Sequence, residues 1–102
     1  MVAPVNWYKR AMAQETGGRV KLALCDADAG RAAYAATLTA GGASYAGAVT
    51  IDEGVIAEGT WSPGEPPAWL RSLLGAFLRS AWKERQRGSE WPLRIHRWRA
   101  GR

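Results

Sequence analysis

The sequence predicts an α+β fold, in which an antiparallel β-meander of about four strands is packed by one long amphipathic helix. Between residues 19 and 61, apolar residues alternate with small or polar ones in short runs separated by glycine-rich turns. Between residues 66 and 88, apolar residues recur at spacings of three and four. A chain of 102 residues has the size of one domain, so we assign residues 1–102 to a single unit.

The N-terminal lead-in, residues 1–18, is expected to hold a short helix. Asn6 can cap a helix over residues 7–15, because its side chain accepts a hydrogen bond from a free backbone N–H. Gly17 and Gly18 would end that helix, since glycine adopts the left-handed conformation that often follows a last turn. A helix of this length depends on contacts with the rest of the domain.

The first three strands follow from the alternation. Residues 19–25 are predicted to be a half-buried strand, and residues 26–31 a turn. Residues 32–40 and 43–51 form the next two strands, joined by a two-residue turn of glycines at 41 and 42. This turn predicts three cross-strand pairs on one face: Leu38 with Tyr45, Ala36 with Gly47, and Tyr34 with Val49.

The turn at residues 52–54 is compatible with two registers. A two-residue loop, Glu53-Gly54, would pair Val49 with Glu58 and place a charge on the apolar face. A three-residue loop with Gly54 in the left-handed conformation pairs Val49 with Ala57 instead, and keeps that face apolar. Because a slip of one residue reverses every side chain, we predict the three-residue loop with a glycine bulge.

The predicted sheet has two unlike faces. One is apolar around a trough of small residues, with Tyr34, Leu38, Tyr45, Val49, Ile51, Val55 and Trp61 around Ala36, Gly47, Ala57 and Gly59. The other is flat and weakly polar, with Ala35, Thr37, Thr39, Ser44, Ala46, Ala48, Thr50, Ile56, Glu58 and Thr60. The trough would receive the helix or a tryptophan. The flat face could meet water or pack against a second copy in a homodimer.

Residues 66–88 are predicted to form the main helix. Pro66 and Pro67 suit its first turn, where a missing N–H is tolerated, and Gly88 suits its end. One side is an apolar row of Leu70, Leu73, Leu74, Phe77, Leu78 and Ala81. A four-residue step places a basic row elsewhere on the helix surface: Arg71, Gly75, Arg79, Lys83 and Arg87.

The last predicted strand covers residues 92–99 and lies at an edge of the sheet. Leu93 and Ile95 alternate there with Arg94 and His96, which gives the strand a basic outer face.

The whole chain has a net charge of +5, and its positive charge is concentrated in the C-terminal part. Residues 1–65 hold five Lys or Arg and seven Asp or Glu, a net −2. Residues 66–102 hold nine Lys or Arg and two Glu, a net +7. Such an asymmetry indicates an anionic partner.

Residues that could carry catalysis or bind a metal are scattered. His96 is the only histidine, and no serine lies in a G-x-S-x-G motif. Cys25 is the only cysteine, and the neighbouring Asp26 opposes thiolate formation. Asp26, Asp28 and Gly30 match only the beginning of a calcium-binding loop. We therefore expect no catalytic residues, no metal and no cofactor.

Apolar runs of signal-peptide or membrane-span length are missing from the sequence. One cysteine allows no intrachain disulfide, which fits a reducing compartment. We expect a cytoplasmic protein that does not engage a membrane.

The leading functional hypothesis is a small non-enzymatic binding module whose basic C-terminal half engages an anionic partner, either nucleic acid or an acidic protein surface. Arginine forks bind phosphates and exposed tryptophans stack on bases. The predicted partner-binding residues are Arg71, Arg79, Lys83, Arg87, Arg94, Arg97, Arg99, Trp91 and Trp98. The alternative is a self-associating or adaptor protein that uses the flat Ala/Thr face or an edge strand for protein–protein contacts.

Overall fold

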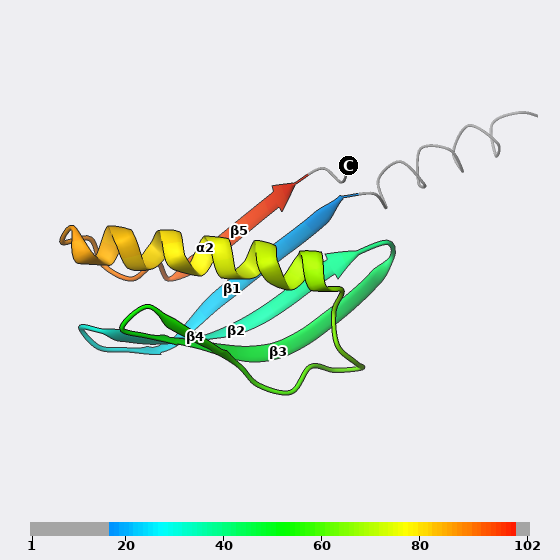
Figure 1. Cartoon of the computed structure of the whole chain (residues 1–102), viewed down its shortest axis with the longest axis horizontal. Coiled ribbons are helices and arrows are strands. Elements are labelled where there is room, and N and C mark those ends of the chain that lie inside the picture. Colours follow the sequence, from blue (N-terminus) through cyan, green and yellow to red (C-terminus); the bar gives the residue numbers. More distant parts are fainter. Residues whose placement is uncertain (1–16, 100–102) are drawn as a thin grey trace, which may run out of the picture.

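A computed structural model describes residues 17–99 and confirms the α+β class. Its elements in chain order are β1 (Gly18–Ala27), β2 (Arg31–Ala40), β3 (Ala43–Asp52), β4 (Val55–Glu58), α2 (Ala68–Gln86) and β5 (Arg94–Arg99) (Figure 1). The predicted helix over residues 7–15 lies outside the described residues. The main helix and the last strand are each slightly shorter than predicted.

The five strands form one open antiparallel sheet in the order β4-β3-β2-β1-β5. Helix α2 lies across one face of this sheet (Figure 1). We call the opposite face the outer face, and within residues 17–99 no helix covers it. Strand β5 is at the edge, as predicted, and its neighbour is β1.

Burial of the apolar row holds α2 on the sheet. Leu70, Leu74 and Leu78 are each 0% exposed, and they share one core with Val20 and Leu38 of the sheet. Burying a leucine side chain contributes about 1.5–3 kcal/mol relative to leaving it in water. The domain therefore depends strongly on the docking of this one helix, since net stabilities are only about 5–15 kcal/mol.

Glycine ends α2 as the sequence predicts. Gly88 has a φ of 102°, and its N–H donates to the carbonyl of Arg85 at 3.0 Å. The N–H of Ser89 donates to the carbonyl of Glu84, also at 3.0 Å. These two bonds form a Schellman motif, which satisfies carbonyls that the helix itself leaves free.

The β2–β3 hairpin has the predicted register. Leu38 pairs with Tyr45, Ala36 with Gly47 and Tyr34 with Val49. Gly41 and Gly42 have φ values of 60° and 77°, so both residues of the turn are left-handed, as this short hairpin loop requires.

The register of β3 with β4 differs from the prediction by one residue. The loop is the two-residue Glu53-Gly54, with φ values of 49° and 86°, and Val49 pairs with Glu58. Consequently Val55 and Ala57 lie on the outer face, where Val55 is 70% exposed. The predicted assignment of Val55, Ala57 and Gly59 to the apolar face, and of Ile56 and Glu58 to the other, is wrong.

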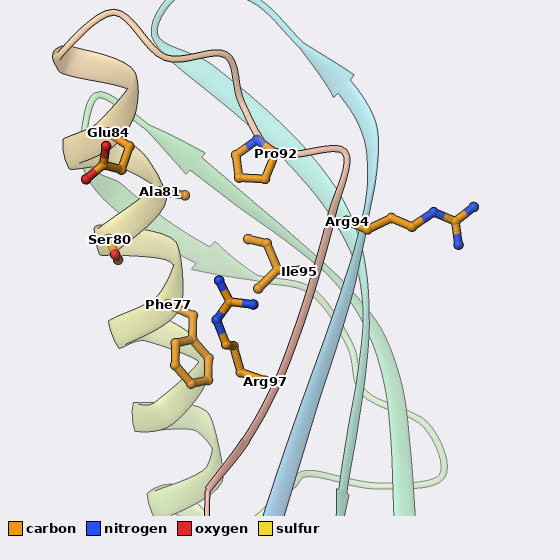
Figure 2. A pocket seen from close by; sticks show the side chains of 8 residues that line it. All are labelled: Phe77, Ser80, Ala81, Glu84, Pro92, Arg94, Ile95 and Arg97. Carbon is orange, nitrogen blue, oxygen red and sulfur yellow. The ribbon is translucent and has the colours of Figure 1, made fainter.

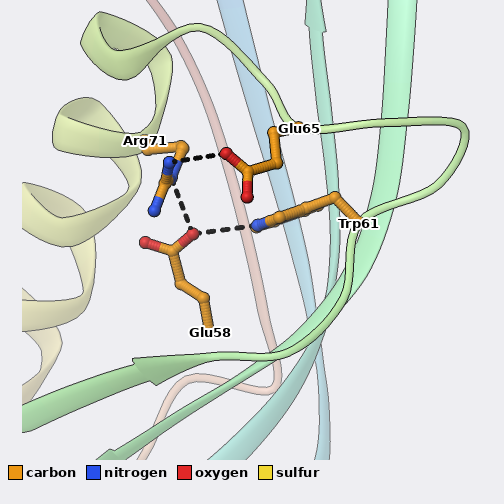
Figure 3. Close-up of polar contacts among 4 residues, drawn as sticks. All are labelled: Glu58, Trp61, Glu65 and Arg71. Atoms are coloured by element: carbon orange, nitrogen blue, oxygen red, sulfur yellow. Dashed lines mark hydrogen bonds and ion pairs between the residues drawn. The ribbon is translucent and has the colours of Figure 1, made fainter.

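Neutralisation of Glu58 explains this register. Its Oε1 accepts hydrogen bonds from Trp61 Nε1 and from Arg71 Nε, each at 2.9 Å (Figure 3). Arg71 also pairs with Glu65 at 3.4 Å. A carboxylate beside the core is tolerated when a cation and a donor both reach it. We rejected the two-residue loop because it places Glu58 on the apolar face, but these two contacts make that position acceptable.

Trp61 sinks into the trough of small residues, as the sequence suggested. It is 6% exposed and lies over Gly47, where an added Cβ would be 2.7 Å from Trp61 Cε3. Only a residue without a side chain permits this approach.

We predict that Leu74→Ala lowers the free energy of unfolding by about 2–5 kcal/mol, because it removes a fully buried side chain from the helix–sheet contact. Urea denaturation measures the change. The matched control is Leu93→Ala, since Leu93 is 75% exposed, and it should change stability by no more than about 0.5 kcal/mol. Equal losses in the two variants would contradict the role of the apolar row.

The buried phenol of Tyr34 makes the stability of the fold depend on pH in the alkaline range. Its side chain is 1% exposed, and its hydroxyl donates to the carbonyl of Pro92 at 2.7 Å. Burial raises the pKa of Tyr34 from 10.0 to about 12. The stabilisation linked to the neutral phenol is therefore complete below pH 10 and is lost as the pH rises towards 12.

We predict that the stability advantage of the wild type over Tyr34→Phe shrinks between pH 10 and pH 12, by roughly 1.4 kcal/mol per pH unit. Over this window the unfolded chain loses the phenolic proton and the folded chain retains it. Chemical denaturation of both chains across the window tests this. Parallel pH profiles for the two chains would contradict it.

Candidate functional site

Two of the tryptophans near the basic end of the chain have structural roles. Trp91 is 5% exposed, and its Nε1 donates to the carbonyl of Asp28 at 2.7 Å. Its ring stacks on Trp82 of α2, with centroids 5.8 Å apart and planes 20° apart. The hydrogen bond holds the segment after α2 to the β1–β2 turn, and the stack holds it to α2. Trp91 was predicted to bind a partner, but its burial removes it from the candidate site.

Half of the cations in the basic row are engaged within the protein. Arg71 is held by Glu58 and Glu65 (Figure 3), and Arg87 Nη1 pairs with Glu84 at 2.8 Å. These two predicted partner-binding residues already have acidic partners. The row also contains Gly75, which is buried beneath the guanidinium of Arg79.

Arg79 and Lys83 remain as a cationic pair on α2. Both side chains are exposed, and within residues 17–99 neither forms an ion pair. Of the four predicted cations on the helix, two therefore have an acidic neighbour and two, Arg79 and Lys83, have none within residues 17–99.

Strand β5 divides its predicted site residues between the two sides of the sheet. Arg97 and Arg99 share the side of Ile95, which faces α2, whereas Arg94 and Trp98 point to the outer face with His96. Figure 2 shows Arg97 directed towards Phe77 of α2 and Arg94 directed away. Arg97 lines a small cleft of about 140 Å³ between α2 and β5, together with Ser80 and Glu84.

The pairing of β5 with β1 assembles a basic and aromatic strip on the outer face. Arg19 lies opposite Trp98, Lys21 opposite His96 and Ala23 opposite Arg94. We call Arg19, Lys21, Arg94, His96 and Trp98 the sheet cluster. All five side chains are exposed, and no acidic residue occurs within these three pairs. Arg19 and Lys21 belong to the acidic part of the sequence, so charge counting alone did not identify them.

A hollow of about 330 Å³ lies at the Arg94 end of this strip and extends towards β2. Lys21, Arg94 and His96 line it together with small side chains of β1 and β2, namely Ala23, Ala35 and Thr37. Because the small side chains do not project far from the sheet, a planar or chain-like anion could lie close to the backbone there. The long side chains of Lys21 and Arg94 could then contact it from the sides. At one end of the strip stands Trp98, which is 57% exposed.

Other kinds of site find little support in the described part of the chain. No group of three or more His, Cys, Asp or Glu residues is placed to hold a metal ion within residues 17–99. Cys25 is exposed at a β-bulge in β1, where its thiol contacts the carbonyl of Ala23 at 3.7 Å. None of the helices in residues 17–99 has the length and hydrophobicity that crossing a bilayer requires.

Comparison with protein-family models, with curated proteins and with solved structures finds no match to this chain.

Proposed function

We propose that the protein is a small, non-enzymatic, cytoplasmic binding module that engages nucleic acid through the sheet cluster. The observation that carries this proposal is the strip of three cations and an exposed indole on the outer face, drawn from two strands distant in sequence. Basic strips of this kind provide the electrostatic footprint of a nucleic-acid-binding surface.

The chemistry of the strip favours phosphates. Arg19 and Arg94 offer guanidinium forks that bind phosphate oxygens with two hydrogen bonds, and Lys21 adds a compact charge between them. Each phosphate that is neutralised releases counterions, so affinity should fall steeply with salt. The same cations would also attract an acidic protein, but the exposed Trp98 beside them favours a ligand with aromatic bases.

We predict that the double variant Lys21→Glu/Arg94→Glu weakens oligonucleotide binding at least tenfold. It should also reduce the slope of log K against log salt concentration by about 1.4, since two phosphate contacts are lost. Fluorescence anisotropy with a labelled single-stranded DNA oligonucleotide of mixed sequence measures both quantities over a salt series.

The matched control is Arg79→Glu/Lys83→Glu, which makes the same change in net charge on the outward side of α2. We expect it to retain most of the affinity. A larger loss in the helix pair would move the site to α2, and equal losses would indicate attraction to net charge alone. Salt-independent binding, or binding of an acidic protein but of no oligonucleotide, would refute the proposal.

A second candidate function, self-association through the outer face of β2, β3 and β4, is favoured by one observation. Val55 is 70% exposed at one end of this face, opposite Asp52, and the small residues Ala46 and Ala48 are exposed further along β3. Sedimentation velocity at low and high salt separates the candidates. A dimer that persists at high salt, in a protein with no oligonucleotide affinity, would favour this second function.

A further inference from the structure

We infer that the sheet cluster selects single-stranded nucleic acid and that Trp98 stacks on an unpaired base. This inference rests on the proposed function and specifies its substrate class. It begins from a contrast between the indoles, because Trp91 is buried and paired with Trp82, whereas Trp98 is 57% exposed. Within residues 17–99, Trp98 forms no aromatic stack.

The Trp98 ring lies against the backbone of Gly17. It lies so close to Gly17 that an added Cβ there would be 2.9 Å from both Cζ2 and Nε1 of the indole. Gly17 is itself buried. The ring thus rests on backbone at one place while more than half of its surface stays in water. A large aromatic surface held in position loses little conformational freedom when a base stacks on it.

The cations are arranged so that they can hold the phosphates next to a stacked base. Arg19 is the direct cross-strand neighbour of Trp98, and Lys21 stands two residues further along β1. Successive side chains on one face of a strand are about 7 Å apart, so these groups follow the sheet for the length of a few nucleotides. A nucleic-acid strand that runs along β1 and β5 could place one base over Trp98 and its phosphates over Arg19, Lys21 and Arg94.

Shape favours a single strand over a duplex. Contact with the bases of a duplex is made in its grooves, through an element such as a helix or a two-stranded ribbon. The sheet cluster instead lies on the surface of a sheet, beside a hollow formed by Ala23, Ala35 and Thr37. In a duplex the bases are already stacked on one another, whereas unpaired bases can turn onto an aromatic side chain.

The test uses the full chain and three labelled DNA probes: a single-stranded 12-mer, its duplex, and an abasic 12-mer with the same phosphates. We expect the wild type to bind the single strand most tightly. Trp98→Ala should lose at least fivefold affinity for the single strand, and none for the abasic probe, because only stacking is removed. Its salt slope should equal that of the wild type, since every cation remains.

Two further variants complete the design. Trp98→Phe keeps an aromatic ring and should recover most of the lost affinity. Trp69→Ala removes another exposed indole, 47% exposed, which lies against Gly18 on the helix-facing side, and it should bind like the wild type. Circular dichroism checks that each variant is folded.

The outcomes separate this inference from the proposed function. Equal, salt-dependent binding of all three probes, with Trp98→Ala unchanged, would overturn the stacking of a base and leave a phosphate-binding module. A duplex preference would overturn the selection of single strands. Failure of the wild type to bind any probe would remove both.

Discussion

The burial of one leucine-rich side of α2 against the sheet is the contact on which the rest of the structure depends. Leu70, Leu74 and Leu78 are fully buried, and α2 lies across one face of the sheet (Figure 1). A single helix can protect only one face, so within residues 17–99 the other face stays open. The open face need not be apolar, and it therefore has room for cations and an exposed indole. The core and the candidate site are two consequences of the same two-layer arrangement.

Local patterns in the sequence predicted the parts of the fold that local physics determines. The helix was predicted because its apolar spacing has a helical period. The β2–β3 hairpin was predicted because Gly41 and Gly42 readily adopt the left-handed conformation that a two-residue turn requires. The register of β4 was mispredicted because it depends on Arg71, which reaches Glu58 from another element. Excluding a charge from the apolar side is a sound rule only when no cation can reach that charge.

The candidate site was only partly predictable, for a related reason. Alternation in residues 19–25 already separated Lys21 from Val20 and Leu22, but no local signal indicates which strand will lie beside it. The pairing of β1 with β5 joins residues nearly the whole described chain apart. Conversely, the even spacing of the basic row on α2 suggested one continuous surface. Glu58, Glu65 and Glu84 pair with two of its cations, and no periodicity reveals this.

Because β5 pairs with β1, the sheet cluster is assembled only when these two distant segments come together during folding. Bringing the ends of a long chain segment together costs conformational entropy, which is offset only once the strands have paired. Pairings between distant segments therefore tend to form late in folding. A nascent chain that lacks the segment through Arg99 would have Arg19 and Lys21 but none of their opposite partners. A ligand that contacts both β1 and β5 would bind only when the two strands are paired. It would therefore stabilise the edge strand β5 in the sheet by mass action. If the sheet cluster binds a ligand, binding and the completion of folding would be coupled at this edge.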